Sequence, residues 1–276
     1  MAKRTSKKCQ RGKSFRLVHR EDLKRELKVP SVFRHFAEMF KIVFGNWRVF
    51  IPLFIIAVLA MFLVVGFPSL ETVVTSSFIG LSLWLITIFL IRHLLAGQEV
   101  SVRDGLYNAL TPLISSIVVF MVAVVQSLPI VLLVVAYSSA VETNFLATPF
   151  YGFLFFTFAA LMVLLSGYLL SSTLVALVAV SAPGLYPLKA LKTASELMKG
   201  RRIKFILRVA AFLILAAIIW FVILVPAVLI VRQIEYIDTA LFTEGMITIL
   251  GAFTVILAAA YFYLYYRWMI DADVVE

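Results

Sequence analysis

The stretch from residue 207 to residue 231, LRVAAFLILAAIIWFVILVPAVLIV, contains one charged side chain, Arg208, at its second position. A helix rises about 1.5 Å per residue, so about 20 apolar residues are enough to cross the hydrocarbon core of a bilayer. Comparable apolar runs predict further spanning helices at 49–67, 78–96, 112–136, 150–180 and 246–267. The sequence therefore predicts an all-α, polytopic integral membrane protein with six transmembrane helices.

The composition supports this class of protein. Hydrophobic residues make up 63% of the 276 residues and charged residues only 14%, whereas soluble domains are about half apolar and about a quarter charged. A chain of this composition needs lipid as its solvent. The single cysteine, Cys9, lies in a basic tail, so no disulfide within the chain and no cysteine-based metal site is expected.

The distribution of charge predicts the orientation of the chain in the membrane. With the N-terminus inside, 24 of the 25 Lys and Arg residues face the cytoplasm, and only Arg232 lies outside. The outer loops, at about 68–77, 137–149 and 232–245, then carry a net charge of −4 and the inner segments +14. Because inner loops are enriched in Lys and Arg, we expect a multi-pass protein of the cell membrane with both termini in the cytoplasm.

Three short amphipathic helices are expected on the cytoplasmic side. One begins after Ser31 and ends at Gly45–Asn46, and a second begins at Ser101, whose spacing to Asp104 is typical of a capping box, and runs into the third span. A third begins at Pro187 and ends near Gly200. Each precedes two spans, which suggests a threefold repeat of a helix followed by a hairpin. A true repeat and the ordinary similarity of apolar helices explain the few matching residues equally well.

The expected domain organisation follows from these features. A basic, largely disordered cytoplasmic tail occupies residues 1–29, and a short acidic cytoplasmic tail occupies residues 271–276. The membrane domain between them covers residues 30–270. Its three units are predicted at about 30–97, 98–182 and 183–270.

Two motifs carry a resemblance to a known family. Residues 190–202 read ALKTASELMKGRR before a long span, and residues 40–47 read FKIVFGNW before the first span. In these motifs the chain resembles the polytopic membrane domain found with glycerophosphodiester phosphodiesterases and its free-standing bacterial relatives of unknown function. The phosphodiesterase activity of that family belongs to a separate soluble barrel, which this chain lacks. The resemblance therefore implies a membrane module without that activity.

No enzyme is predicted from the motifs. The chain has no phosphate-binding Gly-Lys-Ser/Thr loop, no His-Glu-x-x-His and no Gly-x-Ser-x-Gly, so no catalytic residue, cofactor or metal is assigned. The middles of the spans also lack charge, which argues against proton-coupled transport.

Some polar and aromatic residues in the spans invite a structural interpretation. Gln126 and Ser127 form the most polar group within a span, and we weigh an interhelical hydrogen bond against a substrate contact there. Ser166–Ser172, with a break or tilt near Gly167, favours close helix packing. Tyr261, Tyr265 and Trp268 at the end of the last span are interpreted as an interfacial aromatic belt.

The clearest candidate for a binding surface is a cluster of basic residues next to the membrane. Such clusters attract anionic lipid, and we expect a non-enzymatic membrane module that binds anionic lipid, partner proteins or both. A membrane-protein partner or a second copy of the chain is an open alternative, and nucleic acid is not expected. The competing hypothesis is a transporter or permease subunit for an apolar or neutral solute. The candidate lipid-binding or partner-binding residues are Lys189, Lys192, Lys199, Arg201, Arg202, Lys204 and Arg208.

Overall fold

The described part of the chain is entirely helical and contains no strand. The computed structural model describes residues 31–63, 69–143, 148–182, 184–234, 236 and 238–273. The basic tail with Cys9, predicted to be disordered, lies outside these residues. The helices are α2 (Val32–Gly45), α3 (Trp47–Phe62), α4 (Ser69–Leu95), α5 (Val102–Asn108), α6 (Leu113–Glu142), α7 (Pro149–Ala179), α8 (Pro187–Leu197), α9 (Arg202–Val231) and α10 (Thr239–Asp273).

Five of these helices, α4, α6, α7, α9 and α10, are long and apolar enough to cross a membrane. The multi-pass membrane class predicted from the sequence is therefore confirmed at this level. The first predicted span is different, because α3 has 16 residues and meets α2 at an angle of 85°. The number of crossings reaches six when the bent pair of α2 and α3 is counted as one span.

The helix starts follow from local capping chemistry. The Ser31 hydroxyl accepts a hydrogen bond from the Arg34 amide at 3.4 Å. Ser101 and Asp104 form a reciprocal capping box, with each backbone amide donating to the other side chain. Both caps were predicted from the sequence, and both satisfy amides that have no partner within the helix.

The short helices also end as the residue types require, with one exception. Pro187 occupies the first turn of α8, and Gly200, just beyond that helix, has a φ of 73°, which glycine adopts without steric cost. The prediction that the second short helix runs into the third span was wrong. Helix α5 ends at Asn108 and α6 begins after Pro112, because a proline ring clashes with a preceding helical turn and has no amide to donate.

Two further expectations concern the long helices; of the break or tilt expected near Gly167, the break is absent. Helix α7 runs unbroken through Gly167, because a break would leave backbone groups unpaired where no water can reach them. Helix α10 continues to Asp273, so the acidic tail expected from residue 271 begins inside a helix. Arg267 and Asp271, one turn apart on α10, lie 4.0 Å apart and support this extension.

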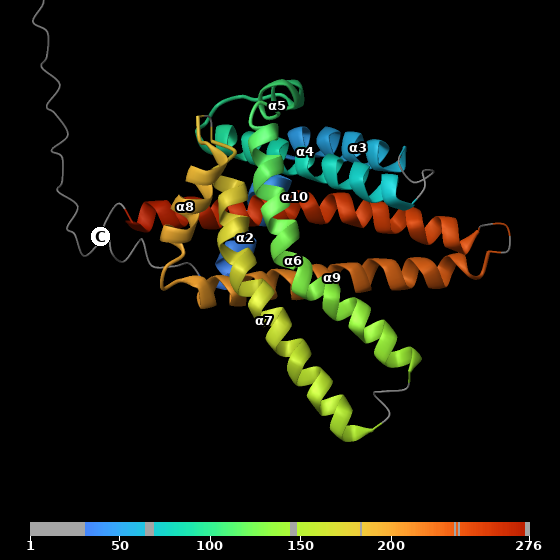
Figure 1. Ribbon diagram of the computed structural model, residues 1–276. Helices are drawn as coiled ribbons and strands as arrows, with labels where there is room; N and C mark the ends of the chain where they lie inside the picture. The colour runs from blue at the N-terminus through green and yellow to red at the C-terminus, as the bar shows by residue number, and fades with distance from the viewer. Residues whose placement is uncertain are drawn as a thin grey trace, which may run out of the picture.

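Helix α10 is the central element of the fold. It contacts α2, α3, α4, α7 and α9. In its most apolar window 44% of the residues are buried, and in that of α4 50%, compared with 6% for α6, α7 and α9. Figure 1 shows α3, α4, α9 and α10 running alongside one another, while the α6–α7 hairpin leaves this group at an angle. The core accordingly lies between α4 and α10.

The order of elements is one short helix followed by two further helices, three times over. In the second and third units both further helices are long, whereas in the first unit α3 has only 16 residues. The ends of α4 and α7 and the starts of α6 and α9 lie near the short helices α5 and α8 (Figure 1). We call this the basic end of the molecule. Within the described residues, Arg232 is the only Lys or Arg at the opposite end.

Candidate functional site

The predicted basic residues on α8 and the start of α9 differ in exposure. Lys189, Lys192, Lys199 and Lys204 are exposed. We call these four residues the exposed lysines. Their ammonium groups face the solvent or headgroup layer outside the packed helices, where anionic groups can reach them.

The two arginines within the same segment are engaged by the protein. Arg201 and Arg202 are half-buried. The Arg202 guanidinium lies 4.2 Å from the centre of the Tyr168 ring and donates a hydrogen bond to the Ser195 hydroxyl at 3.5 Å. Arg202 therefore ties α9 to α7 and α8, and it is less available to an external ligand than the exposed lysines.

Arg208 does not belong to the exposed basic surface. It is 7% exposed, and its guanidinium carbon lies 5.0 Å from the centre of the Tyr265 ring and 5.9 Å from that of Trp268. The backbone carbonyl of Arg208 accepts a hydrogen bond from the Tyr261 hydroxyl at 3.2 Å. The prediction that Arg208 binds lipid at the surface conflicts with this burial, because the side chain is directed at aromatic rings within the protein.

The interpretation of these aromatic residues as an interfacial belt was wrong for Tyr261 and Tyr265, while Trp268 is half-buried. Tyr261 is 1% exposed and Tyr265 3%, so their rings face neighbouring helices and not lipid headgroups. Sequence spacing correctly put the three residues on one face of a helix. It does not reveal that α9 and α2 cover that face.

His35 completes this buried group and was missed in the sequence. Its Nε2 atom lies 3.1 Å from the Tyr261 carbonyl oxygen, and its ring meets that of Tyr261 edge to face at 4.5 Å. Burial lowers the pKa of His35, the nearby Arg208 lowers it further, and the hydrogen bond to Tyr261 partly opposes them. His35 is therefore held as the neutral imidazole. We call His35, Arg208, Tyr261, Tyr265 and Trp268 the aromatic cluster; it joins α2, α9 and α10.

Gln126 makes an interhelical contact. Its side-chain oxygen accepts a hydrogen bond from the Thr173 hydroxyl at 2.6 Å, and its backbone carbonyl accepts one from the Ser166 hydroxyl at 2.8 Å. Ser127 donates within its own helix to the Val124 carbonyl at 2.7 Å. Of the two interpretations weighed for this group, the hydrogen bond between helices is the one observed.

Helix packing near Gln126 does not depend on Gly167. A methyl group added to Gly167 would meet no atom within 4 Å, so the glycine faces open space in this chain. The residue at the contact is Ser166, which is fully buried. The expectation of close packing at this part of α7 holds for Ser166 and fails for Gly167.

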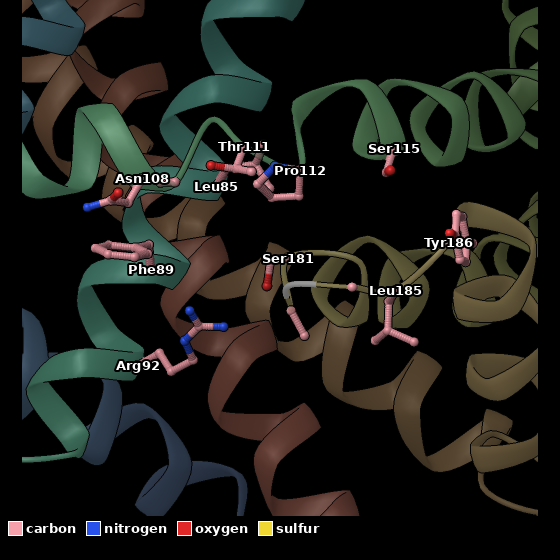
Figure 2. Close-up of a pocket in the computed structure, with 13 residues that line it drawn as sticks. Leu85, Phe89, Arg92, Asn108, Thr111, Pro112, Ser115, Ser181, Leu185 and Tyr186 are labelled. Atoms are coloured by element: carbon pink, nitrogen blue, oxygen red, sulfur yellow. The ribbon is translucent and has the colours of Figure 1, made fainter.

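A cavity of about 460 Å³ lies at the basic end, between the end of α4, the turn joining α5 to α6, and the loop that follows α7 (Figure 2). We call it the Arg92 cavity. Its polar lining residues are Arg92, Asn108, Thr111, Ser115, Ser181 and Tyr186. Among the described residues, no Asp or Glu lines it, and Arg92 is the only charged residue that does.

Arg92 is held in place by its own helix. Its guanidinium carbon lies 5.8 Å from the centre of the Phe89 ring, one turn earlier on α4. Figure 2 shows the guanidinium extending from α4 between Phe89 and Ser181. The sequence places Arg92 near the end of the predicted span 78–96, where a long cationic side chain reaches the membrane interface. The sequence also contains the hydroxyl residues Thr111, Ser115 and Ser181 near the ends of other helices. Only the fold shows that they line the same cavity as Arg92.

Among the described residues, no three His, Cys, Asp or Glu side chains are grouped so that they could hold a metal ion. The geometry at the basic end therefore consists of exposed lysines, a buried aromatic cluster and a cavity with one arginine.

Comparison with protein-family models, characterised proteins and solved structures found no match to this chain. The resemblance to the membrane domain of glycerophosphodiester phosphodiesterases thus stays a prediction that depends on residues 40–47 and 190–202.

Proposed function

We propose that this protein is a non-enzymatic, multi-pass protein of the cell membrane that binds anionic lipid at its basic end. The observation that carries the proposal is the set of exposed lysines on α8 and the start of α9. In residues 187–204 the only carboxylate that opposes the basic residues is Glu196. A Lys or Arg near an anionic bilayer surface contributes about 1 kcal/mol of attraction.

The orientation is part of the proposal. Six crossings, the first made by α3 with α2 bent away from it by 85°, place both termini on the same side, and the charge asymmetry assigns that side to the cytoplasm. Impermeant maleimide labelling of single cysteines in a Cys9→Ser background tests this. We expect Glu142→Cys to react in intact cells and Lys199→Cys to react only after permeabilisation. The reverse pattern would invert the topology.

We also infer that the units α2–α4, α5–α7 and α8–α10 are structural repeats. Each unit begins with one amphipathic cytoplasmic helix. The support is the order of elements and the serine cap that begins both α2 and α5. Each short helix would then lie at the headgroup level beside the start of its hairpin.

Lipid preference within one bilayer tests the proposed function. The purified protein is reconstituted in phosphatidylcholine with trace spin-labelled phosphatidylglycerol or phosphatidylcholine, and the motionally restricted fraction of each label is compared. The variant Lys189→Gln/Lys192→Gln/Lys199→Gln should reduce the preference for phosphatidylglycerol by up to about a hundredfold, since three lysines at about 1 kcal/mol each contribute about 3 kcal/mol.

The control for this experiment is Arg232→Gln, which removes an exposed cation from the opposite end. It should leave the lipid preference unchanged. An unaltered preference in the triple variant would count against the proposal.

The transporter hypothesis depended mainly on Gln126. Its side-chain oxygen is bonded to Thr173, and no contact described above favours a solute path over lipid binding at the basic end.

A further inference from the structure

We propose that the Arg92 cavity is a specific binding site for a phosphate ester, supplied by the headgroup of an anionic phospholipid. The inference depends on the proposed function in one respect, the placement of the basic end at the headgroup level. It goes further by assigning one site and one ligand chemistry.

The charge of the cavity selects an anion. Arg92 contributes one positive charge, and within the described part of the chain no carboxylate lines the cavity or lies within ion-pair distance of Arg92. A phosphodiester carries one negative charge, so it would neutralise the cavity. A planar guanidinium also matches two phosphate oxygens at once.

Polar groups across the cavity from Arg92 can bind the remaining oxygens. Thr111 presents a hydroxyl group from the turn between α5 and α6, Ser115 presents one from the start of α6, and Asn108 presents an amide from the end of α5. The Ser181 hydroxyl already donates to the Val178 carbonyl at 2.7 Å, so it is not counted among the free donors. The donors thus come from a different part of the fold than the cation and surround a multi-oxygen anion.

The apolar lining favours a lipid over a small soluble anion. Leu85, Phe89, Pro112 and Leu185 line the same cavity as the polar groups. A volume of about 460 Å³ is within the usual range for small-molecule sites of about 300–1,000 Å³ and is larger than one phosphate needs. Glycerol and the first acyl carbons would occupy the apolar part.

Native mass spectrometry of the full chain, purified in a zwitterionic detergent, tests the site. Phosphatidylglycerol, glycerol 3-phosphate and inorganic phosphate are added separately. We expect one phosphatidylglycerol to stay bound to the wild type after collisional removal of detergent. The Arg92→Gln variant should bind it about tenfold more weakly or worse, because the variant loses a charge-assisted hydrogen bond.

Two further variants separate binding from folding. Arg103→Gln removes an exposed cation on nearby α5 that does not line the cavity, and it should bind like the wild type. Thr111→Val/Ser115→Ala leaves the charge in place and should weaken binding about threefold, the effect of losing neutral hydrogen bonds. This pair keeps the proposal testable if Arg92→Gln does not fold.

The outcomes distinguish this site from the general lipid preference. Equal retention by wild type and Arg92→Gln would overturn the site, while the exposed lysines could still produce the lipid preference measured in bilayers. Binding of inorganic phosphate as tight as that of phosphatidylglycerol would overturn the ester assignment. Displacement by glycerol 3-phosphate at equal concentration would support the phosphate-ester site and assign it to a soluble ester.

Discussion

Replacing Arg208 by methionine tests whether this arginine stabilises the fold or binds lipid. Methionine keeps an unbranched stem but removes the cation that lies 5.0 Å from the Tyr265 ring and 5.9 Å from the Trp268 ring. A cation–π contact contributes about 0.5–2 kcal/mol, so two contacts together contribute about 1–4 kcal/mol. Removing a buried charge also removes its desolvation penalty, and we expect a net loss in the lower half of that range.

Steric trapping in lipid bicelles measures the free energy of unfolding for this variant. The matched control is Lys204→Met, one turn earlier on α9 and exposed, which should change stability by less than about 0.5 kcal/mol. A double-mutant cycle with Tyr265→Leu should give a coupling energy of about 0.5–2 kcal/mol. Unchanged stability of Arg208→Met, together with a lost preference for anionic lipid, would refute the buried role.

Three further predictions concern contacts between helices. Thr173→Val should lower the free energy of unfolding by about 0.6 kcal/mol, the average for an interhelical hydrogen bond in a membrane. In a Gln126→Leu background, where this hydrogen bond is already absent, the same change should lower it by less. Steric trapping measures both values. A Cβ at Gly105 would lie 3.3 Å from Leu90 and in similar contact with Ile86, so Gly105→Val should lower the melting temperature by several degrees. The control is Gly251→Val, where a Cβ meets nothing within 4 Å and the melting temperature should not fall. Equal melting temperatures for the two variants would contradict the close packing of α5 on α4. The pKa of His35 is lowered below 6.5 in the folded state, so the unfolded chain binds more protons below that pH. Stability should therefore be full above about pH 6.5 and fall as the pH drops further. A fall in stability with pH that persists in His35→Asn would show that His35 is not its cause.

Four contributions set the direction of the pKa shift of His35; Lys41, Arg267 and Asp271 line the same pocket as His35 and Glu38. Arg208 on α9 lowers its pKa, Glu38 on its own helix raises it, and the Tyr261 carbonyl on α10 raises it through the hydrogen bond, while burial is the largest cause and lowers it. The net direction is downward. Acid should therefore loosen the contact of α2 with α10 before it affects the long helices.

The elements of the fold were predictable because the signals are local. Long runs without charge identify the spanning helices, and a serine three residues before an acid identifies a helix start. The α5–α6 boundary was missed, although Pro112 marks it, because the short helix was expected to continue directly into the span predicted from residue 112. Of the break or tilt expected at Gly167, the break is absent, because helical hydrogen bonds are hard to replace in lipid.

The candidate site was less predictable because it depends on which helices are neighbours. Tyr265 and Arg208 have the spacing typical of interfacial residues, and the sequence cannot distinguish a ring that faces lipid from one that faces another helix. Arg92 likewise gave the signal of a residue that reaches the interface. Its meaning changed when the turn containing Thr111 was found across the same cavity.

Basic residues at one end of this protein therefore have three different physical roles, although they contribute equally to the count that predicts topology. Lys199 is exposed and contributes to the field that attracts anionic lipid. Arg208 is buried against aromatic rings, so its charge stabilises the packing of α9 against α10 and does not act on lipid. Arg92 is half-buried in a cavity without carboxylates, where a single charge can select one ligand. Since only exposed cations act on the bilayer at large, the number of charges available for general lipid attraction is smaller than the net charge suggests. Neutralising an exposed lysine should consequently change lipid preference without changing stability. Neutralising Arg208 should lower stability without changing lipid preference.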